Sequence, residues 1–209
     1  MNFTFSHKKL TDGKLYLIYL GIFVVLLLFE FFVVDRAASF FEVAGNDQTF
    51  ETLSYSGVLS ALMIAPAIEE LFFRGYLNGL RKHYWLITPQ VLLGIIILPE
   101  WTIEISIGFL FLLCLILTDR YRVDDQVRIS KLLFYVSMLF SSVLFSLFHL
   151  SKVNHHSGYI SFLFVMVAML PVAVYFSYIR YNSGLTSAII THMLYNATAL
   201  TINTFIYSS

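Results

Sequence analysis

Long apolar runs alternate with short polar segments along the whole chain of 209 residues. Most runs reach the length of about 17–25 residues that an α-helix needs to cross the hydrocarbon core of a bilayer. The pattern therefore predicts an all-α fold, a polytopic transmembrane helical bundle with about seven spans, formed by a single membrane-embedded domain over residues 1–209. The predicted spans are residues 15–34, 56–80, 85–101, 103–118, 131–150, 159–179 and 185–207.

The two shortest of these runs lie in residues 85–118, and Pro99-Glu100-Trp101 separates them. At about 17 residues each, they are near the lower limit for crossing a bilayer. We interpret them as a transmembrane hairpin, which preserves the orientation of the spans that follow. The seven-span topology fails if these residues form one long re-entrant element instead.

The composition supports a membrane protein and narrows its partners. Hydrophobic residues make up 58% of the chain and charged residues only 12%, about half the charged fraction of a soluble domain. The formal net charge is zero, which argues against nucleic acid as a partner. The apolar runs make the lipid bilayer the expected surroundings. The single cysteine, Cys114, excludes a disulfide framework within the chain.

The basic residues predict how the spans are oriented. With the N-terminus in the cytoplasm and Arg74 inside a span set aside, ten basic residues fall on the cytoplasmic side, and only Arg36 and Lys152 fall on the outer side. Because cytoplasmic loops carry an excess of Lys and Arg, we expect a multi-pass protein of the cell membrane with a cytoplasmic N-terminus. The ten cytoplasmic residues are Lys8, Lys9, Lys14, Arg81, Lys82, Arg120, Arg122, Arg128, Lys131 and Arg180.

Three charged residues lie inside the second predicted span: Glu69, Glu70 and Arg74. Charged groups in hydrocarbon are costly, so ionisable residues inside a span are candidates for function. Glu70 and Arg74 are four residues apart and share one helical face, where they can form an ion pair. Glu69 is turned roughly 100° away from Glu70 around the helix. We therefore expect the pair to support a site and the Glu69 carboxylate to remain available for chemistry.

Later spans contribute His149, His192 and Asn196, of which the last two are four residues apart on one helical face. With Glu69 they provide a carboxylate, two imidazoles and an amide for one polar pocket. Such a pocket suits general-base hydrolysis by water, and it equally suits a metal site with an open position. Each residue also has a simpler interpretation as an interfacial or interhelical hydrogen-bonding group. Glu30, near the end of the first span, is expected to be structural or interfacial.

Three segments resemble, in order, the motifs of a known family. They are Glu-Glu-Leu-Phe-Phe-Arg-Gly at residues 69–75, Phe-Ser-Leu-Phe-His at 145–149 and His-Met-Leu-Tyr-Asn at 192–196. The family is the CPBP family of CAAX proteases and bacteriocin-processing enzymes, also called the type II CAAX prenyl endopeptidase or Abi family. Residues 181–188 resemble the stretch that leads into the third motif, and the resemblance covers about residues 56–207. It implies an intramembrane protease built from a helical bundle.

The resemblance also implies a role for each motif residue. Glu69 would be the base that activates water, and His149 would help to hold that water. His192 and Asn196 would stabilise the oxyanion, and the ion pair beside Glu69 would support the site. The chain departs from the family in the length between its first two motifs, and the extra length corresponds to the predicted hairpin of residues 85–118.

Two mechanisms remain open, because the family has been described both as metalloproteases and as metal-independent glutamate proteases. A zinc site would take its ligands from Glu69, His149 and His192. These residues lie on three different helices without a short paired spacing, and Asn196 is a natural oxyanion donor but a poor zinc ligand. We therefore expect that no cofactor is required, with zinc as the alternative.

The leading expectation is hydrolysis of a peptide bond in a membrane-associated peptide or protein. Leader peptides, bacteriocins and peptide pheromones are candidate substrates, and self-immunity against bacteriocins is a variant of this hypothesis. The main alternative is a catalytically silent membrane scaffold. A transporter that relays protons through the carboxylates is less favoured because the chain has no inverted repeat. Substitution of Glu69 by Ala separates the first two, since a scaffold keeps its phenotype and a protease loses it.

Overall fold

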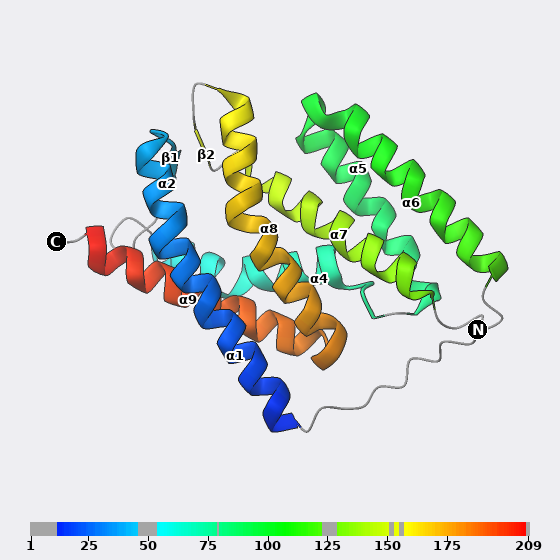
Figure 1. Cartoon of the computed structure of the whole chain (residues 1–209), viewed down its shortest axis with the longest axis horizontal. Coiled ribbons are helices and arrows are strands. Elements are labelled where there is room, and N and C mark those ends of the chain that lie inside the picture. Colours follow the sequence, from blue (N-terminus) through cyan, green and yellow to red (C-terminus); the bar gives the residue numbers. More distant parts are fainter. Residues whose placement is uncertain are drawn as a thin grey trace.

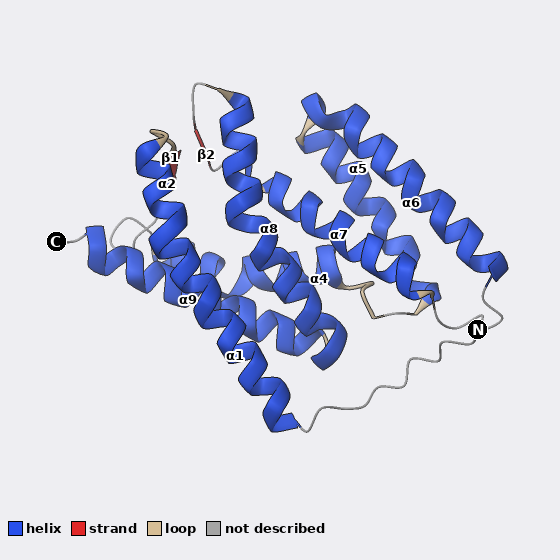
Figure 2. Cartoon of the chain, viewed as in Figure 1, coloured by secondary structure: helices blue, strands red, loops and turns tan. Residues whose placement is uncertain are grey.

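The computed structural model describes residues 12–45, 54–78, 80–122, 129–150, 153–154 and 157–207, and most of these residues are helical (Figures 1 and 2). Two short strands, β1 (Ala44–Gly45) and β2 (Val153–Asn154), pair in antiparallel fashion. The helices are α1 (Asp12–Phe29), α2 (Asp35–Phe40), α3 (Tyr55–Leu59), α4 (Ala65–Arg74), α5 (Ile87–Ile97), α6 (Thr102–Arg122), α7 (Lys131–Phe148), α8 (Gly158–Ser183) and α9 (Leu185–Tyr207). The connecting turns are π-helical at Glu30–Val34 and Ser60–Ile64, and 3₁₀-helical at Arg81–Leu86 and Pro99–Trp101.

The predicted polytopic bundle is confirmed by the length and composition of these helices. Five helical segments are long and apolar enough to cross a membrane, and a sixth, His83–Ile97, is apolar but shorter. Helix α9 is also long, with 23 residues, but it carries His192, Asn196 and several threonines, and it is not one of these five segments. The five segments are Gly13–Phe40, Tyr55–Arg74, Pro99–Asp119, Lys131–Phe148 and Gly158–Ser183.

Two predicted boundaries differ from the structure. The first span does not end at residue 34, because the helix continues through a π-helical turn and α2 as far as Phe40. The second span was expected to reach residue 80, but α4 ends at Arg74. After Arg74 the chain tightens into a turn, in which the backbone N–H of Leu77 bonds to the Arg74 carbonyl at 3.0 Å. Side chains of other helices, described below, donate hydrogen bonds to the carbonyls at this helix end.

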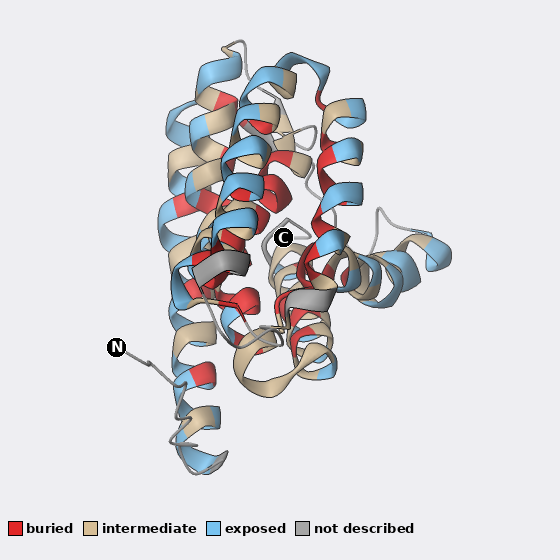
Figure 3. Ribbon diagram, turned by 90° about the vertical axis from the view of Figure 1, so that its right-hand side faces the viewer, coloured by how far each residue is buried: buried red, intermediate tan, exposed pale blue. Residues whose placement is uncertain are grey.

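Helix α8 lies at the centre of the bundle and packs against α7, α9 and α1 (Figure 1). The α5–α6 hairpin, which the apolar runs of residues 85–118 predict, packs on α7. Figure 3 shows buried residues on the faces that the helices turn toward one another and exposed residues on the outer faces. Many of the exposed side chains are large and apolar, as expected of a surface that faces lipid.

Small polar side chains are buried on α7 and α8, and the hydroxyls of Ser142 and Ser177 lie 3.4 Å apart across the contact between the two helices. Four serines of α7 are buried, and so is Ser177 of α8. Small residues let helix backbones approach closely in membrane proteins. Three of these hydroxyls donate to the carbonyl four residues earlier in their own helix: those of Ser137, Ser146 and, at 2.9 Å from the Ala173 carbonyl, Ser177. The four serines of α7 are Ser137, Ser141, Ser142 and Ser146.

Tyrosine hydroxyls tie α1 to α8 and α9. The Tyr175 hydroxyl donates to the Tyr19 carbonyl at 2.9 Å, and the Tyr19 hydroxyl lies 2.8 Å from that of Ser183. Further along the first helix, Tyr195 of α9 donates to the carboxylate of Glu30 in the π-helical turn. Glu30 thus links α1 to the helix that carries His192 and Asn196.

Candidate active site

Glu69 and Glu70 follow one another on α4 but face different surroundings. The Glu70 side chain is fully buried and pairs with Arg74, the residue four positions later. The Glu69 side chain is 24% exposed. The turn of roughly 100° between consecutive helical positions accounts for this difference, as the sequence spacing predicts.

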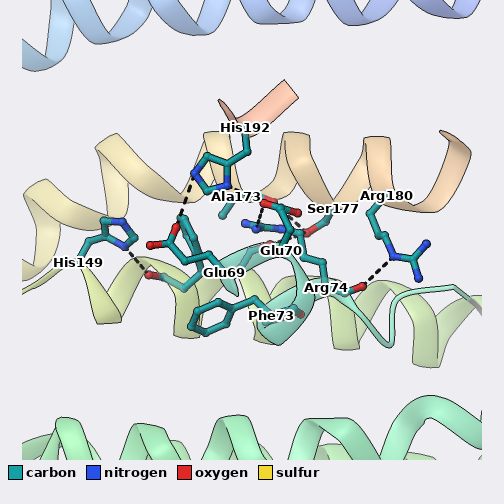
Figure 4. Close-up of polar contacts among 12 residues, drawn as sticks. Glu69, Glu70, Phe73, Arg74, His149, Ala173, Ser177, Arg180 and His192 are labelled. Atoms are coloured by element: carbon teal, nitrogen blue, oxygen red, sulfur yellow. Dashed lines mark hydrogen bonds and ion pairs between the residues drawn. The ribbon is translucent and has the colours of Figure 1, made fainter. Parts of the chain in front are cut away.

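His192 of α9 lies between the two carboxylates. Its Nδ1 is 2.9 Å from Oε1 of Glu70, and its Nε2 is 3.6 Å from Oε2 of Glu69 (Figure 4). An ionised carboxylate can only accept a hydrogen bond, so the proton on Nδ1 is the one donated to Glu70. This bond orients the imidazole so that Nε2 points toward Glu69. The ring is buried and stacks on Phe176, with the two ring centroids 4.4 Å apart.

The Arg74 guanidinium is fully buried against aromatic rings and hydrogen-bond partners. It donates to Glu70, and its Nε donates to the Ser177 hydroxyl at 3.2 Å. Its carbon lies 4.5 Å from the centre of the Phe145 ring and 5.4 Å from that of Phe176, within the range of cation–π attraction. These contacts hold Arg74 in one position, so Glu70 is held with it.

His149 caps the end of α7, and its Nδ1 lies 2.9 Å from the Phe145 carbonyl. A carbonyl only accepts, so Nδ1 carries the proton and Nε2 is the basic nitrogen of the neutral ring. The Phe145 ring centre lies 4.6 Å from that of His149 and 6.0 Å from that of His192. Both imidazoles therefore flank one aromatic ring, and Figure 4 shows the Glu69 carboxylate between them.

A family model described as type II CAAX prenyl endopeptidase Rce1-like matches residues 51–198. The chain belongs to this family. No curated protein and no solved structure matches the chain significantly. The family is one of endopeptidases, and the apolar helices make the chain a multi-pass membrane protein. The matched region contains α4, α7 and the first part of α9, which carry the polar cluster, whereas α1 lies outside it.

Asn196 makes a contact that the sequence did not predict. Its side-chain nitrogen donates to the Ala61 carbonyl at 3.0 Å. Ala61 lies in the π-helical turn Ser60–Ile64, which directly precedes α4. Such turns disturb the regular backbone hydrogen bonding of a helix and are frequent at functional sites. The bond fixes the Asn196 amide and joins α9 to the start of the helix that carries Glu69.

Sequence reasoning missed the aromatic and hydroxyl groups that support Arg74. Ser177 and Phe176 lie on α8, which carries none of the three motifs. A serine or a phenylalanine in a long apolar helix gives no signal of its own, since such residues are common in membrane helices. Only tertiary packing brings them to the guanidinium.

The residues expected to hold zinc do not gather into a three-ligand site. Within the described residues, no group of three or more His, Cys, Asp and Glu side chains is arranged to hold a metal ion. The donor types of Glu69, His149 and His192 suit zinc, and each histidine has a hydrogen-bonded Nδ1 of the kind seen behind zinc ligands. Because the side chains are not arranged as a ligand set, the mechanism below uses only groups of the chain itself.

Proposed function

We propose that this protein is an intramembrane endopeptidase that hydrolyses a peptide bond of a membrane-associated peptide or protein. The observation that carries this proposal is that Glu69 and Glu70 have different contacts. Glu70 is engaged by Arg74 and His192, whereas the partly exposed Glu69 carboxylate lies beside two imidazoles. A carboxylate placed in this way is suited to act as a general base toward water.

In the proposed reaction, a water molecule enters between Glu69 and His149. Glu69 takes one proton from this water, and Nε2 of His149 accepts a hydrogen bond from its other O–H. The oxygen attacks the carbonyl carbon of the substrate and forms a tetrahedral oxyanion. When the C–N bond breaks, the proton held by Glu69 passes to the leaving amine. Atoms and charge balance without a co-reactant.

His192 and Asn196 are the proposed donors to the oxyanion. The bond from Asn196 to Ala61 uses one N–H of the amide and fixes the direction of the second. His192 can donate from Nε2 when its ring is doubly protonated, since Nδ1 is directed at Glu70.

The substrate and the orientation in the membrane belong to the same proposal. The family description supports CAAX-type endopeptidase activity in general. Within that range we propose short membrane-associated peptides, such as leader peptides or bacteriocin precursors, as substrates. We also propose a cytoplasmic N-terminus, from the excess of basic residues on that side.

The test compares the peptides of cells that carry wild-type protein, Glu69→Gln or Glu104→Gln. Glu104 lies on α6 with an exposed side chain, so it controls for the loss of a glutamate in a membrane helix. We expect new peptide termini in wild-type and Glu104→Gln cells that are missing from Glu69→Gln cells. Identical termini in all three strains would contradict the proposal and favour the silent scaffold.

A further inference from the structure

The last four carbonyl groups of an α-helix have no partner within that helix. At the end of α4, the carbonyls of Phe72, Phe73, Arg74 and Gly75 each accept a hydrogen bond from a side chain of another helix. A helix end inside a membrane protein needs such partners because the hydrocarbon supplies none. Here they come from three helices, although α4 is only 10 residues long.

Two of the donors are Gln90 of α5 and Ser141 of α7. The side-chain nitrogen of Gln90 lies 2.6 Å from the Phe72 carbonyl, and the Ser141 hydroxyl donates to the Phe73 carbonyl. The orientation of the Gln90 amide follows from its partner, since a carbonyl oxygen can only meet a donor.

The third donor is Arg180 of α8. Its Nε lies 3.0 Å from the Arg74 carbonyl (Figure 4). Its Nη2 lies 2.9 Å from the Gly75 carbonyl. The planar guanidinium holds two successive carbonyls at once, which an ammonium group cannot do with the same geometry. A positive charge at this position also complements the partial negative charge of a helix C-terminus.

Burial of the Gln90 side chain costs stability, which suggests that the residue has a role other than packing. Its side chain is fully buried, and its Oε1 has no hydrogen-bond partner among the described residues. A buried polar atom without a partner destabilises a fold, so an apolar residue would serve packing better. Gln90 lies on α5 of the α5–α6 hairpin, which the chain places between the first two motifs. The hairpin therefore reaches the helix that carries Glu69.

We propose that Arg180 and Gln90 are positioning residues, which fix the end of α4 and thereby the placement of Glu69 and Glu70 against His192. The catalytic part of this inference rests on the proposed function. A short helix that slides or turns by about 1 Å moves its side chains out of reactive geometry, at a cost of about a hundredfold in rate. The bond from Asn196 to Ala61 holds the other end of the same helical segment.

The experiment uses the full chain in lipid nanodiscs, with Arg180→Met, Arg180→Lys, Gln90→Leu and the control Arg36→Met. Arg36 is an exposed arginine on α2, so its substitution removes the same charge away from α4. Backbone hydrogen exchange is measured in the peptide that covers α4 and in a reference peptide from α6. The peptide termini that depend on Glu69 are measured in cells with the same variants.

We expect exchange in the last turn of α4 to rise about tenfold or more in Arg180→Met, with α6 unchanged, because two hydrogen bonds are lost. Gln90→Leu should give a smaller rise, and Arg180→Lys an intermediate one. Glu69-dependent products should fall in the same order, with Arg36→Met equal to wild type.

Unchanged hydrogen exchange in α4 would overturn the proposal that Arg180 and Gln90 fix the end of this helix. An equal rise of exchange in α4 and α6 would instead show that these residues have a general role in stability. Raised exchange with normal product levels would overturn the catalytic part. If wild type and Glu69→Gln give identical peptide termini, the proposed function is wrong. The exchange data still test whether Arg180 and Gln90 fix the end of α4, because that measurement needs no substrate.

Discussion

Glu69 and Glu70 are neighbours on α4, but their different surroundings give these identical side chains different roles. Glu70 is fully buried, and Arg74 and His192 both donate to its Oε1. Glu69 is partly exposed, and its Oε2 lies 3.6 Å from Nε2 of His192, beyond the usual hydrogen-bond distance. A buried ion pair adds little stability but is costly to break, whereas an accessible carboxylate beside imidazoles can exchange protons. We therefore assign a structural role to Glu70 and a chemical role to Glu69.

The largest expected effect is on turnover in Glu69→Gln. The amide keeps the shape of the side chain but cannot take a proton from water. We expect the cleavage rate to fall by about 10²–10⁴-fold, which is the usual contribution of a general base. Cleavage of a peptide identified in the cellular comparison is measured with purified protein in vesicles, together with thermal unfolding in detergent. A variant that unfolds much earlier than wild type would show that Glu69 is structural after all.

The converse variant, Glu70→Gln, should act mainly on stability. It leaves the Arg74 guanidinium buried without a charged partner, and breaking a buried pair from one side costs about 3–5 kcal/mol. We expect its unfolding temperature in detergent to lie clearly below those of Glu69→Gln and of the exposed control Glu104→Gln. Equal unfolding temperatures for Glu69→Gln and Glu70→Gln would remove the distinction between the two residues.

The sequence was sufficient to predict the features that depend on a single helix. The apolar runs predicted the helices, and the spacing of four residues predicted the Glu70–Arg74 pair, which the structure contains. The contact of Asn196 with Ala61 was not predicted, because a π-helical turn leaves no clear mark in the sequence. Arg180 was interpreted from its position near a span end as a marker of orientation. Its bonds to the end of α4 depend on tertiary packing that no spacing encodes.

A smaller effect is expected one turn beyond His192 along α9, where Tyr195 donates to Glu30. Tyr195→Phe keeps the ring and leaves the Glu30 carboxylate without this donor, at a cost of about 1–3 kcal/mol in stability. Replacing both partners, in Tyr195→Phe with Glu30→Leu, should recover most of that loss. Cleavage by the single variant should stay near that of wild type, since Glu30 does not contact Glu69 or Glu70 in the described hydrogen bonds. Loss of cleavage at normal stability would extend the active site to α1.

The smallest expected effect is that of metal removal. A catalytic zinc typically takes three protein ligands close around one point, and the described side chains of Glu69, His149 and His192 are not arranged in that way. Nδ1 of His192 is directed at Glu70, and the Asn196 amide beside it is an oxyanion donor rather than a ligand. We therefore expect purified protein to hold less than one zinc per chain by elemental analysis, and cleavage to continue in chelator. A zinc protease assayed in the same buffer shows that the chelator works. One zinc per chain, with cleavage lost in chelator and restored by zinc, would contradict this expectation and make Glu69 a metal ligand. The two glutamates would then have similar roles, because each would hold a positive charge.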